Sequence, residues 1–171
     1  KYQDQQTGMI WHELSQSAAF LDWKNYPYMY LHVDLSFQFL STFAEYYSVT
    51  GDLPFVQAHW NSIQSAHQYC VSLLEKDGLP HIPSEKRGER EQEALSDELA
   101  LSVNWLTASQ AFATLAAATD HTDLANQARA TVQQLGPLIA KRYWDETAQS
   151  WITGYSRSGA PLPNRGIGPV G

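Results

Sequence analysis

The chain has 171 residues, 43% of them hydrophobic and 17% charged, which is enough for one domain with its own core and is not the composition of a disordered protein. A formal net charge of -7 disfavours nucleic acid and anionic membrane surfaces as partners, and no apolar run approaches the roughly 20 residues that a membrane span requires. With Cys70 as the only cysteine, the chain can form neither an internal disulfide nor a cysteine-based zinc site.

The first feature in chain order is a segment rich in aromatic and acidic residues, which extends from Gly8 to the first predicted helix. Aromatic rings stack on pyranose rings, and carboxylates and imidazoles bind sugar hydroxyls, so this composition favours a sugar-binding cleft. The pair His12 and Glu13 lacks the HExxH spacing of a zinc site, and the other histidines form no ligand cluster in the sequence. We therefore expect no metal and no other cofactor.

Apolar residues at helical spacing then predict four helices in two pairs, over residues 33–47, 55–74, 101–115 and 124–143. The first pair is interrupted at Thr50-Gly51-Asp52 and the second at Thr119-Asp120-His121, and the last helix should end near Trp144. Each pair reads as an αα-hairpin. The two breaks lie at corresponding places, which indicates a repeated unit.

A four-helix bundle is the alternative arrangement of the same apolar stripes. Its loops would typically have 2 to 8 residues. The connections between these hairpins run to roughly 20 residues, and loops of that size are usually functional. We therefore expect an all-α fold of stacked hairpins with the long loops on one face. Since each hairpin leaves apolar surface for a neighbour, we expect this chain to be part of a larger array.

Several runs of the sequence resemble one family. GMIWHELSQSA, DWKNYPYMYLHVDLSFQFL and YYSVTGDLPFVQAHW resemble the six-hairpin (α/α)6 toroid glycosidases, particularly bacterial amylo-α-1,6-glucosidase-like and glycogen-debranching-like proteins. DGLPHIP, LALSVNWLTASQAF and YWDETAQSWITGYSRSGAP are similar to later segments of that family. The resemblance implies that residues 1–171 form roughly half of a toroidal catalytic domain, with no internal domain boundary.

The resemblance also implies a reaction. Members of the family hydrolyse oligo- or polysaccharides, and for this chain the resemblance implies α-glucosidic or related linkages. Hydrolysis usually proceeds with inversion, which requires a carboxylic acid and a carboxylate base about 6.5–9.5 Å apart. The family places the acid in the loop that holds Glu85, Glu89, Glu91, Glu93, Asp97 and Glu98 in this sequence. We rank Glu89 and Glu91 first and expect the base to lie outside this chain. A mixed-charge run is also typical of a solvated surface.

Asp34 is the first candidate for substrate binding. It stands at the start of the first helix, after an aromatic run, and the resemblance implies that it holds sugar hydroxyls; an aspartate there could also favour the helix dipole or cap backbone amides. The resemblance and the aromatic composition add further cleft residues: His12, Glu13, Trp23, Tyr26, Tyr28 and His32.

Two other functions remain open. A relative could bind carbohydrate through the aromatic cleft without the catalytic acid, and a helical-repeat scaffold could bind a protein through the long loops. The sequence leaves the oligomeric state open and also the compartment, since the bacterial cytoplasm and the periplasm or exterior are both compatible with it.

Overall fold

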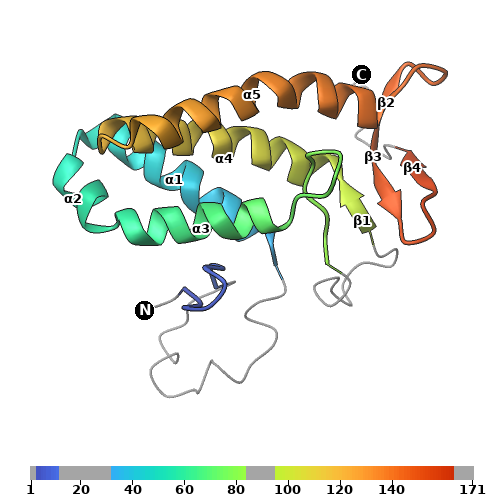
Figure 1. Ribbon diagram of the computed structural model, residues 1–171. Coiled ribbons are helices and arrows are strands. Elements are labelled where there is room, and N and C mark those ends of the chain that lie inside the picture. Colours follow the sequence, from blue (N-terminus) through green and yellow to red (C-terminus); the bar gives the residue numbers. More distant parts are fainter. Residues whose placement is uncertain (1–2, 12–31, 84–94, 164–171) are drawn as a thin grey trace, which may run out of the picture.

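A computed structural model describes residues 3–11, 32–83 and 95–163 of the chain. Helices dominate this part: α1 (Asp34–Thr50), α2 (Leu53–Ala58), α3 (Trp60–Ser72), α4 (Leu99–Ala118) and α5 (Thr122–Tyr143). The hairpins are α1 with α3, joined through the short α2, and α4 with α5; α4 contacts both α1 and α5 (Figure 1). None of the helices in these three segments is both long and apolar enough to cross a lipid bilayer.

The predicted breaks between paired helices are confirmed. Gly51 adopts a left-handed conformation with φ of 65°, and its N–H donates to the carbonyl of Tyr47 at 2.8 Å, which ends α1. Asp52 then accepts a hydrogen bond from the backbone N–H of Phe55 and caps α2. In the second hairpin Asp120 has φ of 63°, and α5 begins two residues later.

The second predicted helix is not continuous. His59 leaves helical geometry, with φ of -108° and ψ of 9°, and so separates α2 from α3. Its backbone N–H still donates to carbonyls in α2, those of Phe55 and Val56. The break lets α2 form the corner between α1 and α3.

The core is formed where α1, α3 and α5 pack around α4, and an aromatic contact joins α1 to α4 within it. Phe37, near the start of α1, meets Trp105, in the second turn of α4, with ring centroids 6.0 Å apart. Both side chains are buried. The contact and the ribbon show that α1 and α4 run in the same direction (Figure 1). Their N-terminal ends therefore lie at the same end of the helical layer.

The expectation of an all-α fold is wrong, because the chain also forms an antiparallel sheet of four strands. Its strands are β1 (Leu95–Glu98), β2 (Trp144–Asp145), β3 (Ser150–Ser156) and β4 (Pro161–Pro163). Strand β3 pairs with each of the other three, through registers such as Glu98 with Gly154 and Trp144 with Trp151.

The physical reason for the sheet is visible in β3. Trp151 and Thr153 are exposed while Ile152 and Gly154 are buried, an alternation with the period of 2 that defines a strand with one covered face. This alternation covers few residues, and β1 and β2 are shorter still. The sequence therefore predicts helices alone, because helical spacing extends over many more residues of the chain than this alternation does.

Candidate functional site

The predicted site residues belong to segments that join the described structure at one end of the helical layer. Residues 12–31 lead into the start of α1, and residues 84–94 lead into β1, which continues directly into α4. Since α1 and α4 are parallel neighbours, both segments join the described structure at the same end. The catalytic candidates and most of the binding candidates lie outside the described residues: His12, Glu13, Trp23, Tyr26, Tyr28, Glu89 and Glu91.

Asp34 is the first residue of α1 and is half-buried. The N-cap position belongs to Val33, and the carboxylate of Asp34 accepts a hydrogen bond from the side-chain amide of Gln38 at 3.0 Å. A negative charge in the first turn interacts favourably with the helix dipole. A carboxylate can accept about four hydrogen bonds, so Gln38 uses only part of this capacity. His32, also half-buried, precedes Asp34 by two residues.

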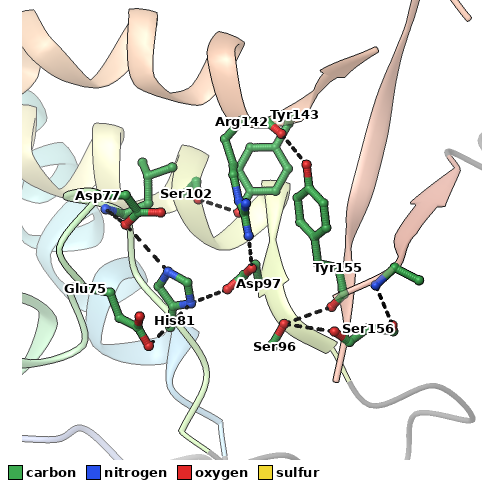
Figure 2. A network of polar contacts seen from close by, with 12 residues as sticks. Glu75, Asp77, His81, Ser96, Asp97, Ser102, Arg142, Tyr143, Tyr155 and Ser156 are labelled. Atoms are coloured by element: carbon green, nitrogen blue, oxygen red, sulfur yellow. Dashed lines mark hydrogen bonds and ion pairs between the residues drawn. The ribbon is translucent and has the colours of Figure 1, made fainter. Parts of the chain in front are cut away.

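A charged network that the sequence did not predict lies beside the start of α4 (Figure 2). Its centre is Asp97 of β1, which is only 3% exposed. One carboxylate oxygen of Asp97 forms an ion pair with Arg142 of α5 and the other with His81, in the loop after α3. Two more carboxylates face the imidazole, with Glu75 Oε1 3.7 Å from Nδ1 and Asp77 Oδ1 3.6 Å from Nε2.

Tyr155 of β3 holds the arginine in place. The guanidinium of Arg142 lies over the Tyr155 ring, 3.9 Å from its centre, and the Tyr155 hydroxyl donates to the Arg142 carbonyl at 2.7 Å. Ser96 fixes β1 to the same strand, because its hydroxyl donates to the carbonyls of Tyr155 and Ser156. The network thus joins the α3–β1 loop, the sheet and the end of α5.

The electrostatics of the network decide what Asp97 can do. Burial alone would raise the pKa of Asp97, but the contacts with His81 and Arg142 outweigh burial and hold its pKa below the ordinary value. A general acid for glycoside hydrolysis needs a raised pKa instead. Asp97 belonged to the acidic loop from which the acid was predicted, and its ionised, doubly paired carboxylate is unsuited to that role. Glu89 and Glu91 remain the first candidates.

Sequence reasoning missed His81 and Arg142 as partners of Asp97. The contact between Asp97 and Arg142 spans 45 positions in the chain, and no motif links them. The charged run around Asp97 reads as a surface, because only the fold shows that this one member is buried. The nearest local signal is the loop DGLPHIP, whose prolines hold the chain around His81 extended.

The described part of this end therefore supplies hydrogen-bond acceptors and a fixed framework. Asp34 offers acceptors at the start of α1, and the network around Asp97 fixes the strand that leads into α4. The sequence matches no model of a known protein family, and a search of curated proteins found no significant relative. The chemistry of the residues and their placement thus carry the functional argument.

Proposed function

We propose that the chain belongs to a glycoside hydrolase that cleaves α-glucosidic or related linkages of oligo- or polysaccharides by general acid–base catalysis, with inversion. The observation that carries the proposal is the parallel packing of α1 and α4, because the points at which segments 12–31 and 84–94 lead into α1 and β1 lie at the same end of the helical layer. One segment is rich in aromatic residues and the other in carboxylates. A glycosidase site needs both, since rings hold the sugar and carboxyl groups act on the glycosidic oxygen and on water.

The proposal assigns three roles. Asp34 binds hydroxyls of the sugar, because it presents a carboxylate at the start of α1. Glu89 or Glu91 protonates the leaving oxygen, which requires that its carboxyl be shielded from water. Asp97 is a structural residue that fixes β1, and through β1 the start of α4.

Sugar release and binding test the proposal. The protein would be assayed on α-glucosides, maltooligosaccharides, isomaltose-type branches, trehalose and mannosides, with Asp34→Asn, Glu89→Gln and Glu91→Gln as variants. Loss of a hydrogen bond to a charged group should lower kcat/KM of Asp34→Asn by about 10- to 100-fold. Replacing the true acid should lower kcat by about 10²- to 10⁴-fold.

The control is Glu45→Gln, which neutralises an exposed carboxylate on the same helix, near its other end. It should keep wild-type rates. Binding that Asp34→Asn weakens, without any hydrolysis by the wild type, would indicate the non-catalytic carbohydrate-binding relative. Absence of both binding and hydrolysis across the panel would contradict the sugar-binding hypothesis as a whole.

A further inference from the structure

His81 is surrounded by carboxylates on both edges of its ring (Figure 2). Its Nδ1 contacts Asp97 and lies 3.7 Å from Glu75, while its Nε2 lies 3.6 Å from Asp77. A neutral imidazole has only one N–H, so its other nitrogen would turn a lone pair toward a carboxylate. The geometry therefore fits the imidazolium form, in which both nitrogens are donors.

His81 also sits where separate parts of the fold meet. Its backbone N–H donates to the carbonyl of Leu73 at 2.9 Å, which closes the loop after α3. The next residue, Ile82, donates to the carbonyl of Ser96 in β1 at 2.9 Å. The side chain then reaches Asp97, which Arg142 connects to α5. A backbone hydrogen bond and an ion pair thus both attach the loop to β1.

We propose that His81 is a proton-dependent latch, which fastens the loop of residues 73–83 to β1 and the end of α5 and releases it when the imidazole loses its proton. The groups that face it are Glu75 and Asp77 of the loop and Asp97 of β1, with Arg142 of α5 on the far side of Asp97. Deprotonation leaves three carboxylates facing an uncharged ring, with Arg142 paired to Asp97. The inference is independent of the proposed hydrolase function, because it uses none of the residues to which that proposal assigns catalysis or sugar binding.

The sign of the pH dependence follows from the contacts. The ion pair with Asp97 raises the pKa of His81, burial opposes it, and the charges of Asp97, Glu75 and Asp77 add to the increase. A group whose pKa is raised by folding stabilises the folded form fully below its ordinary pKa. That contribution is lost as the pH rises through the raised pKa. The loop is therefore released from β1 as the pH rises through the raised pKa of His81.

The test combines the titration of the His81 ring, followed by NMR, with amide hydrogen exchange between pH 6 and 9, corrected for intrinsic rates. We expect the protection of residues 73–83 to fall in one transition that coincides with the titration of His81, while the middle of α4 stays protected. In His81→Gln the loop should be weakly protected at every pH. Protection of the loop that does not change with pH in the wild type overturns the proposal.

A second variant keeps the proposal testable if His81→Gln does not fold. Glu75→Gln/Asp77→Asn removes two of the facing charges but leaves Asp97 in place, and should move the midpoint down by about 0.5 pH unit. Glu45→Gln/Asp123→Asn makes the same change of charge at exposed positions on α1 and α5 and should leave the midpoint where it is. Equal midpoints in the two double variants overturn the latch.

Discussion

At the scale of single residues, Gly154 of β3 determines how closely β1 can approach at Asp97. A Cβ added at Gly154 would lie 2.2 Å from the carbonyl oxygen of Asp97, a distance that no real contact shows. Glycine inside a strand often marks such a close backbone approach. The position of the buried carboxylate thus depends on the absence of a side chain on the neighbouring strand.

Gly154→Ala should therefore force β1 away from β3 and lower the free energy of unfolding by about 1–3 kcal/mol. Urea denaturation measures the change. Gly136→Ala in α5 is the matched control, since its Cβ would meet nothing within 4 Å and alanine favours a helix by about 0.5–1 kcal/mol over glycine. Equal effects of the two substitutions would contradict the packing argument.

His67 illustrates a second residue whose role depends on packing. Its ring stacks on Phe112 with centroids 3.7 Å apart, and burial lowers its pKa from 6.5 to about 4. The structure places the ring between α3 and α4, against the core.

The lowered pKa of His67 predicts a loss of stability in acid. Because the unfolded chain takes up a proton that the folded form resists, the free energy of unfolding should decrease as the pH falls from 6.5 to 4. His67→Phe keeps an aromatic ring against Phe112 and has no proton to bind. Urea midpoints at pH 7 and pH 5 should differ less in the variant than in the wild type. Parallel curves would show that His67 does not titrate in this range.

At the scale of elements, the helices could be predicted and the strands were missed. Helix spacing is a local pattern, and Gly51 and Asp52 mark a helix end and a helix start within the sequence itself. Strand β1 has four residues and gains its partner from β3, nearly sixty positions away. A short strand of that kind shows in the sequence only as a few alternating residues, as at Trp151 and Ile152.

In the candidate site, too, a local feature could be predicted from the sequence and a long-range contact could not. The position of Asp34 at the start of a helix was predictable, because an acidic residue before an amphipathic run is a local signal. The pairing of Asp97 with His81 and Arg142 was not, since ion pairs between distant residues depend on the tertiary fold. The sequence shows Asp97 only as one member of an acidic run, whereas its burial and its two ion pairs are seen only in the fold.

At the scale of the whole molecule, the helix contacts differ in how far apart their partners lie in the sequence. α4 packs against α5, its neighbour in sequence, and against α1, which is distant in sequence. The contact of Phe37 with Trp105 and the pairing of β1 with β3 both close long stretches of chain. Closing a long loop costs chain entropy before any contact repays it.

This difference in sequence separation predicts an order of folding. We expect the α4–α5 hairpin to form early during folding and α1 to dock later, so the two hairpins should report differently on the transition state. Leu135→Ala, at a buried position of α5, should mainly slow folding, whereas Phe37→Leu should mainly accelerate unfolding. Stopped-flow chevron analysis separates the two rates, and the reverse assignment would mean that the first hairpin is the folding nucleus.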